Sequence, residues 1–147
     1  MRLRTWIAIV LGSLLLASCG GGPVKRVSPP TASVQELVVR ADGNWHLRMR
    51  LQNFSNVPMT FSGIDAELET GDRAVGTIKL SFKLDIPGES ADVFEADLLP
   101  LAGTRAPVGD FAYRLHGTIS SSEPKGNFKF TRESQLSPAP GLPGTWR

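Results

Sequence analysis

The chain has little of what most reactive sites are built from. Its 147 residues include one cysteine and two histidines, so it forms no internal disulfide, and a lone thiol does not hold zinc. His46 and His116 fall on the outward parity of expected strands and have no second ligand at metal spacing, so we expect surface histidines. The chain has no Gly-x-Ser-x-Gly elbow and no recognisable Ser, His and Asp pattern, although geometry can assemble a triad that spacing does not reveal. We therefore expect no enzyme, no cofactor and no metal site.

A charge excess is also missing. The chain carries 16 Lys and Arg against 14 Asp and Glu, and two of the basic residues, Arg2 and Arg4, belong to the N-terminal leader described below. The remainder is formally neutral, with charges of both signs interspersed, and its aromatic residues fall mainly on the inward parity of the expected strands. These features argue against the basic stripe and the stacking platform of nucleic-acid-binding proteins, so we expect no nucleic-acid partner.

The first nineteen residues are the most informative part of the sequence. Arg2 and Arg4 precede an apolar run from Trp6 to Leu16, which is followed by small residues and then by Cys19. A basic stretch, a short apolar core and small residues before a cleavage point are typical of a secretory signal. The apolar run is shorter than the roughly 20 residues that span a membrane. Because a cysteine directly follows the cut, the segment resembles the bacterial lipoprotein signal.

That resemblance implies a signal peptide over residues 1–18 and acylation of Cys19, for instance with palmitate, which anchors the protein in a membrane. Gly20 follows the cysteine, and a residue other than Asp at this position implies sorting to the outer membrane, facing the periplasm. The alternatives are an uncleaved anchor and a buried core helix, and the Arg flank and the N-terminal position argue against the helix. We therefore expect a lipid-anchored protein of the bacterial cell envelope.

Composition divides the rest of the chain into three segments. Residues 19–32 hold the lipidated cysteine and a flexible tether rich in Gly and Pro, in which Lys25 and Arg26 either touch anionic head groups or stay in solution. Residues 33–136 suffice for one small domain with one core. Residues 137–147 contain three prolines and two glycines, so we expect no regular structure there. Leu142 and Trp146 in this tail either pack back on the domain, which we favour, or contact a partner.

The central segment has the period of two that is typical of strands with one buried face. Residues 44–52 alternate strictly between apolar and polar, and further runs lie at 34–39, 59–68, 78–85, 90–98, 111–119 and from 128 onward. The apolar positions change parity across Ser62 and Gly63, which predicts a β-bulge. Seven short strands and no helical period favour an all-β fold, a single seven-stranded antiparallel β-sandwich of immunoglobulin or fibronectin-III type, with a small barrel as the alternative. The expected core consists of large inward-facing residues: Trp45, Leu47, Met49, Leu51, Phe61, Ile64, Leu68, Ile78, Leu80, Phe82, Tyr113, Leu115, Phe128 and Phe130.

Three carboxylates, those of Asp65, Glu67 and Glu69, fall on the outer face of one expected strand. Such a row could bind calcium or supply an acid/base pair, but it is more often a solvated face that blunts edge-to-edge association. Arg48 and Arg50, on another outward face, are candidates for pairing with these carboxylates across strands.

Short motifs between residues 47 and 94 carry a family resemblance. A strand ends at Asn53, a turn with Asn56 and Pro58 follows, and the next alternating strand ends at the glycine turn of Gly71. Ala74-Val75-Gly76 and Ile86-Pro87-Gly88 then precede a closing strand. Together these elements resemble the late embryogenesis abundant type 2 family, which includes the water-stress-and-hypersensitive-response domain. The family often has a tighter Asn-Pro-Asn triplet, which Phe54 and Ser55 interrupt here.

The turn residues of this motif have plain physical roles. Asn53 and Asn56 can bond the backbone of their own turn, Pro58 fixes the start of the next strand, and Gly71 permits a hairpin turn. The resemblance implies a fibronectin-III-like sandwich with a non-catalytic role in desiccation or envelope stress, and the family has no active site to carry over.

Two roles therefore stand ahead of an enzyme. The first is a lipid-anchored domain that protects other proteins or membranes by surface contact as water is lost. The second is a protein-binding accessory module in envelope assembly or transport, which would use a strand edge or the C-terminal tail. The expected partners are a membrane, reached through the N-terminal lipid, and a client or envelope protein.

Overall fold

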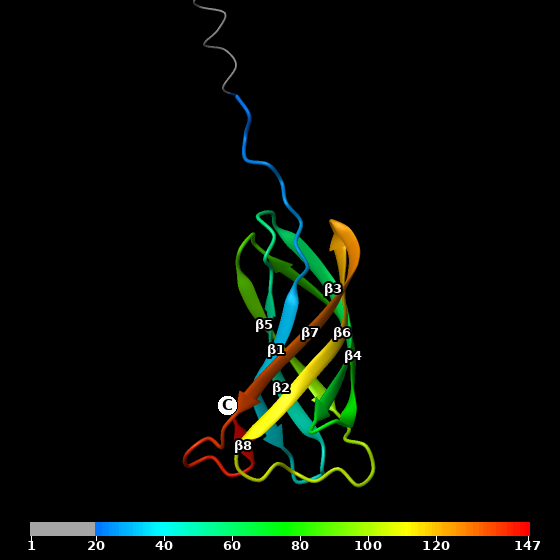
Figure 1. Cartoon of the computed structure of the whole chain (residues 1–147), viewed down its shortest axis with the longest axis vertical. Helices are drawn as coiled ribbons and strands as arrows, with labels where there is room; N and C mark the ends of the chain where they lie inside the picture. Colours follow the sequence, from blue (N-terminus) through cyan, green and yellow to red (C-terminus); the bar gives the residue numbers. More distant parts are fainter. Residues whose placement is uncertain (1–19) are drawn as a thin grey trace, which may run out of the picture.

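The computed structural model describes residues 20–147, so the expected signal peptide and Cys19 lie outside the described residues. Over that range the chain forms two antiparallel β-sheets, and the N-terminal tether leaves from one end of the pair (Figure 1). Residues 20–147 contain no helix, and hence none long and apolar enough to cross a membrane.

Seven of the eight strands correspond to the seven runs that alternation predicted. Most of them extend beyond the predicted run, because ladder pairing continues where the side chains no longer alternate; the first residues of β7, for example, pair with the end of β6. The strands are β1 (Thr31–Val39), β2 (Trp45–Gln52), β3 (Met59–Thr70), β4 (Arg73–Ile86), β5 (Ala91–Leu98), β6 (Phe111–Glu123), β7 (Lys125–Leu136) and β8 (Thr145–Trp146).

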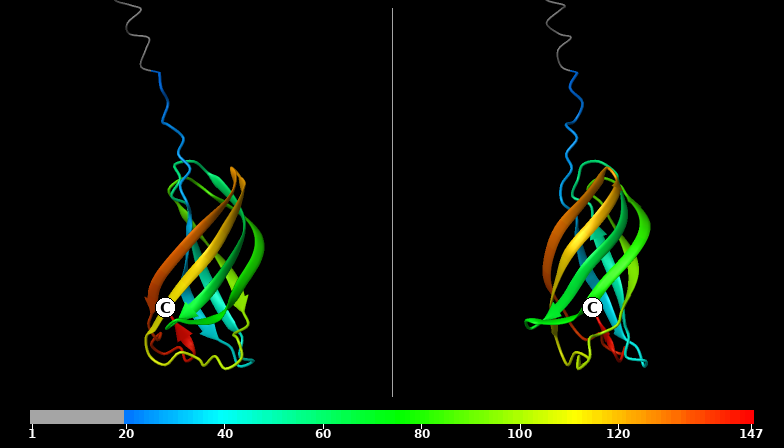
Figure 2. Two further views of the ribbon diagram at one scale, coloured as in Figure 1. Left: turned by 45° about the vertical axis from the view of Figure 1, so that its right-hand side comes forward. Right: turned by 90° about the vertical axis from the view of Figure 1, so that its right-hand side faces the viewer.

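The strands divide into a sheet of order β5-β2-β1-β8 and a sheet of order β4-β3-β6-β7. Every neighbouring pair is antiparallel. Figure 2 shows the two twisted sheets from two further sides. The prediction of an all-β antiparallel sandwich with seven main strands is confirmed. Each sheet keeps its own edge strands, so the alternative of a closed barrel does not hold.

The bulge predicted in β3 is confirmed. The register shifts between Phe61 and Gly63 both in the pairing with β4 and in the pairing with β6. A Cβ atom on residue 63 would lie 2.8 Å from the carbonyl oxygen of Leu80, so glycine allows the bulged strand to stay close to its neighbour.

At a second bulge, in β1, a side chain from the facing sheet forms hydrogen bonds with the backbone. The register of β1 shifts between Val34 and Glu36. The N–H of Val34 donates to the hydroxyl oxygen of Tyr113 on β6 at 3.0 Å, and the same hydroxyl lies 3.3 Å from the Val34 carbonyl oxygen, to which it donates. Val34 keeps its place opposite Met49, and β8 pairs only with Leu37 and Val38, so the hydroxyl serves backbone groups of Val34 that β8 does not reach. Burial raises the pKa of Tyr113, because a phenolate there would lose its hydration.

The core lies between the sheets and holds most of the expected residues, but Leu80, Phe82 and Phe128 are only partly buried. The prediction that these three belong to the buried set is wrong. They lie on β4 and β7, the edge strands of their sheet, where a strand neighbour shields only one side, although Ile78 and Phe130 on the same two strands are buried. Phe82 packs instead on Phe94 of β5, with ring centroids 4.9 Å apart, at the open side between the two sheets.

The C-terminal segment is more regular than its prolines predicted. Thr145 and Trp146 form β8, which pairs with Leu37 and Val38 of β1. Trp146 packs back on the domain and its indole N–H donates to the Gly109 carbonyl oxygen at 2.9 Å. The expectation of no regular structure over residues 137–147 is wrong at this strand, because neither of its two residues is a proline, so each keeps its N–H for pairing.

The two ends of the sandwich carry different loops (Figures 1 and 2). At the end where the tether leaves, here called the tether pole, lie loop 53–58, turn 87–90 and the β6–β7 turn. At the opposite end, the far pole, lie turn 40–44, the long loop 99–110 and segment 137–144.

Candidate functional site

Two of the segments that carried the family resemblance, loop 53–58 and turn 87–90, meet at the tether pole around the fully buried side chain of Asn53. Its Nδ2 lies 3.0 Å from the carbonyl oxygen of Val57 and 3.2 and 3.0 Å from those of Ile86 and Pro87, so these three acceptors share its two N–H groups. Its Oδ1 accepts from the N–H of Ser55 at 2.9 Å. Asn53 therefore joins its own turn to the Ile-Pro-Gly turn, which is far away in sequence, and this role is structural.

Two of the glycines of the motif, Gly71 and Gly88, also have conformational roles. Gly71 and Asp72, which form the tight β3–β4 turn, have φ angles of 51° and 62°, and a two-residue hairpin turn with positive φ at both positions favours glycine. A Cβ atom on Gly88 would lie 2.7 Å from the carbonyl carbon of Asn56, so glycine allows turn 87–90 to pack against loop 53–58. Pro58 directly precedes β3 and is exposed.

Asn56 binds the tether and not its own turn. Its Oδ1 accepts from the N–H of Arg26 at 2.7 Å, and its Nδ2 donates to the carbonyl oxygen of Val24 at 2.8 Å. Its backbone N–H donates to the Arg26 carbonyl oxygen at 3.2 Å, and the N–H of Ser28 donates to the Ser55 hydroxyl oxygen at 2.8 Å. The expectation for Asn56 is wrong because its side chain lies on the exposed side of the loop, where the tether passes. Residues 24–28 are therefore docked on the tether pole.

A groove of about 830 Å³ opens beside the docked tether. Its walls are formed by the tether, the first residues of β3, the end of β4 and the β6–β7 turn. Three charged residues belong to its lining, Lys25, Asp85 and Glu123, and the rest is mainly apolar: Val27, Val57, Pro58, Met59, Ile86 and Pro87.

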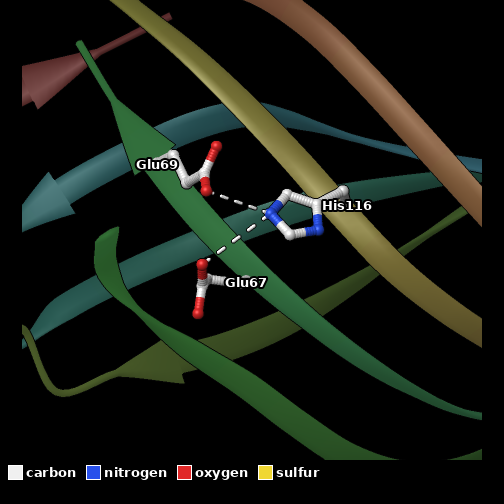
Figure 3. A group of neighbouring side chains, drawn as sticks. All are labelled: Glu67, Glu69 and His116. Carbon is white, nitrogen blue, oxygen red and sulfur yellow. Dashed lines mark ion pairs between the residues drawn. The ribbon is translucent and has the colours of Figure 1, made fainter. Parts of the chain in front are cut away.

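A cluster of charged side chains, formed by Glu67, Glu69 and His116, lies on the outer face of the sheet β4-β3-β6-β7 (Figure 3). The Nε2 atom of His116 is 3.7 Å from Glu67 Oε1 and 3.2 Å from Glu69 Oε1, and the three ligand atoms all lie within 4.8 Å of one another. All three side chains are half-buried. Two carboxylates thus converge on one ring nitrogen.

Strand register brings this cluster together. Glu67 of β3 lies opposite His116 of β6, and Glu69, two residues further on, lies opposite Arg114, so the four side chains project from one face. Gly117 follows the histidine, and a Cβ atom there would overlap the backbone of β3, so glycine permits the close approach of the two strands. Arg114 contacts the second oxygen of Glu69, Oε2, at 3.8 Å.

His46 lies on the outer face of the sheet β5-β2-β1-β8 and also contacts two carboxylates, but it does so through both of its ring nitrogens. Its Nε2 lies 2.9 Å from Glu95 Oε2 and its Nδ1 lies 2.7 Å from Asp97 Oδ1. Arg40 adds a contact with Asp97 Oδ1 at 3.1 Å. The hydrogen bond from His46, assisted by the charge of Arg40, lowers the pKa of Asp97. Here each ring nitrogen has its own carboxylate, so the ring bridges two acids and forms no convergent site.

The structure changes two of the expectations for these charged residues. Arg48 and Arg50 do not pair with the carboxylates of β3, because β2 belongs to the other sheet. Asp65 pairs instead with Lys79 at 3.3 Å, and Glu69 contacts His116 and Arg114. Both histidines lie on outer faces, as parity predicted, but His116 has the carboxylate neighbours that its sequence surroundings did not reveal. No spacing in the sequence indicated this cluster, because it joins two strands that are distant along the chain.

The far pole exposes apolar side chains. Leu99, Leu101 and Val108, all in loop 99–110, are 77%, 55% and 95% exposed, and Leu142 in segment 137–144 is 45% exposed. Three of these four side chains belong to one loop, and single exposed apolar residues are common on protein surfaces.

No family model matches the chain, and no curated protein matches it. Solved structures do. A protein from Arabidopsis thaliana, determined in solution, has a TM-score of 0.50 at 11% identity, over 84% of this chain and 87% of that one. A crystal structure of an Archaeoglobus fulgidus protein has a TM-score of 0.44 at 17% identity, over 78% and 98% of the two chains. A protein described as a candidate late embryogenesis abundant protein, also from Arabidopsis, has a TM-score of 0.44 at 15% identity, over 93% and 88%. The likeness to the first of these structures shows a shared fold alone.

Proposed function

We propose that the chain is a lipid-anchored, non-catalytic protein of the bacterial envelope, whose sandwich protects other proteins or membranes by surface contact when water is lost. The docked tether is the observation that carries the proposal. Hydrogen bonds hold the chain to the tether pole from Val24 onward, and only five peptide steps separate that residue from Cys19. An extended chain spans about 3.3–3.6 Å per residue, so an acyl group on Cys19 would keep the tether pole within roughly 18 Å of the bilayer.

The two basic residues of the docked tether fit such an orientation, and acidic side chains, among them Glu89 3.9 Å from Arg26, share this pole with them. Lys25 and Arg26 are exposed there, and each basic residue near an anionic membrane surface contributes about 1 kcal/mol of attraction. The mostly apolar groove opens at the same end. The far pole would then face away from the membrane, toward the periplasm if the protein resides in the outer membrane.

Labelling with palmitate tests the anchor. Cells that express the full chain are grown with labelled palmitate and fractionated, beside cells that express Cys19→Ala. We expect label in the membrane-bound wild-type protein and neither label nor cleavage of the leader in the variant. Equal labelling of the two proteins, or an unlabelled wild type, would contradict lipid anchoring.

The resemblance of residues 47–94 to stress-related domains and the mixed-charge surface support the protective role. Weak, unspecific contact needs no pocket and no strongly charged face, and a neutral surface of interspersed charges suits it. The test is to dry a labile enzyme with the protein and, in parallel, with an inert protein of the same mass. We expect more activity after rehydration in the first sample, and equal recovery in the two samples would refute the protective role.

A second candidate, binding of one envelope protein, is favoured by the apolar side chains of the far pole. In the proposed orientation loop 99–110 faces away from the membrane, where a partner can reach Leu101 and Val108. Pull-down from envelope extracts with the wild type and with Leu101→Asp/Val108→Asp distinguishes the two roles. One stoichiometric partner that the variant loses supports this second role, and the same weak mixture with both proteins supports the first.

A further inference from the structure

We propose that Glu67, Glu69 and His116 bind one divalent transition-metal ion, with zinc the best match, on the outer face of sheet β4-β3-β6-β7. The site is independent of the lipid anchor and of the protective role, since neither enters the argument for it. Imidazole nitrogen and carboxylate oxygen are common zinc ligands, and zinc sites that stay accessible often have three protein ligands and one open position.

The distances within the cluster fit one shared ion. A tetrahedral zinc ion with bonds of about 2.0–2.1 Å separates its ligand atoms by about 3.3–3.4 Å. The two separations that involve His116 Nε2 are 3.2 and 3.7 Å, and the two carboxylate oxygens lie within 4.8 Å of each other. Rotations of the flexible Glu side chains would bring the three atoms to the tetrahedral spacing. The ligands come from two adjacent strands in register, which fixes their backbone positions before an ion arrives.

A metal ion would engage both carboxylates, whereas an ordinary ion pair gives one of them a hydrogen bond and leaves the other to water. One ring N–H donates one good hydrogen bond, so a protonated Nε2 satisfies one of the two carboxylates and leaves the other facing it without a proton. A metal ion on the lone pair of a neutral imidazole compensates both carboxylates at once. His46 shows the ion-pair alternative within the same chain, because its two carboxylates occupy different ring nitrogens.

Neighbouring groups support the ligands and leave the ion accessible. Arg114 holds the second oxygen of Glu69 at 3.8 Å, so Oε1 is the oxygen left toward the histidine. Lys79 pairs with Asp65, and no Lys or Arg nitrogen of residues 20–147 lies within 4.0 Å of Glu67. The side chains of Glu67 and His116 are 42% and 38% exposed, so water or an external ligand can take the fourth position. The expected outcome is a site for one ion that joins β3 to β6.

Metal titration of the purified full chain, stripped with a chelator, tests the proposal. Calorimetry with Zn²⁺ should show one ion per chain for the wild type and for the matched control His46→Ala. His116→Ala and Glu69→Gln should bind at least about tenfold more weakly. Substitution with Co²⁺ should give the visible absorption of a tetrahedral site without the near-ultraviolet thiolate band that Cys19 would add.

Several results would overturn the proposal. These are no Zn²⁺ binding by the wild type, binding of Ca²⁺ in preference to Zn²⁺, binding that His116→Ala leaves unchanged, or equal losses in the two histidine variants. If circular dichroism shows that a variant does not fold, nuclear magnetic resonance of the wild type decides instead. Zn²⁺ should shift the ring signals of His116 and not those of His46, and the reverse result would refute the site.

Discussion

Replacing Asn53 with alanine is expected to destabilise the domain strongly, although the residue belongs to a loop. The substitution removes the Nδ2 donor that serves Val57, Ile86 and Pro87, and the Oδ1 acceptor that serves Ser55. Alanine also leaves a small space where the amide was packed. The perturbation therefore affects both turns of the tether pole at once.

The magnitude follows from which of these bonds are buried. The bonds to the Ile86 carbonyl oxygen and from the Ser55 N–H are buried, and the other two are partly buried. A buried backbone group left without a partner costs about 1–3 kcal/mol, whereas partly buried groups can bond water instead. The free energy of unfolding should therefore fall by about 2–6 kcal/mol, out of a total of about 5–15 kcal/mol for a typical domain.

Urea denaturation followed by tryptophan fluorescence measures this loss. Asn56→Ala is the matched control, because its side chain is exposed and bonds only the tether; we expect a change of less than about 0.5 kcal/mol for it, together with faster amide hydrogen exchange at Arg26. If the free energy of unfolding of Asn53→Ala lies within about 0.5 kcal/mol of that of Asn56→Ala, the reasoning that Asn53 joins the two turns is refuted.

Three further predictions concern the charged face and the core. Tyr113→Phe should lower the free energy of unfolding by about 1–3 kcal/mol because it leaves the Val34 N–H without a partner. In alkaline denaturation the wild type should also lose stability as the pH rises through the raised pKa of Tyr113, and the variant should not show this loss. Gly117→Ala should cost about 1–3 kcal/mol in thermal or urea unfolding, since its Cβ would overlap β3; an unchanged stability would show that the strands can separate freely. The carboxyl of Asp97, held by His46, should have a pKa below 3.8 in a nuclear magnetic resonance titration. Its stabilising effect is therefore present above that pH and is lost as the pH falls through the lowered pKa. If the stability of Asp97→Asn depends on acid pH in the same way as that of the wild type, this role is refuted.

The period of two was enough to locate the seven main strands, because each buries one face. Even the bulge at Gly63 was visible as a change of parity. What alternation does not contain is the position of a strand within its sheet. Leu80 and Phe82 on the edge strand β4 alternate as regularly as Leu47 and Met49 on the central strand β2, yet they are less buried. Even within β4, Ile78 is buried and Leu80 is only partly so, so equal patterns lead to different burial.

The candidate site depended on long-range pairing, which the sequence does not encode locally. The acidic row was visible, but its partners were misassigned to Arg48 and Arg50, since a pattern does not say which sheet a strand joins. His116 reaches Glu67 and Glu69 only because β6 pairs with β3. Asn56 was recognised as a turn residue, but its bonds to the tether depend on where the tether runs, which Gly and Pro content does not predict.

Survival of the host bacterium after drying tests the central proposal most directly, because it depends on the anchor and on the protective surface together. A strain that lacks the chain is complemented with the wild type, with Cys19→Ala or with an empty vector, then dried and rehydrated. The account predicts that viability falls without the chain, returns with the wild type and does not return with Cys19→Ala at equal expression. Equal viability of the deletion strain and its wild-type-complemented counterpart would contradict it.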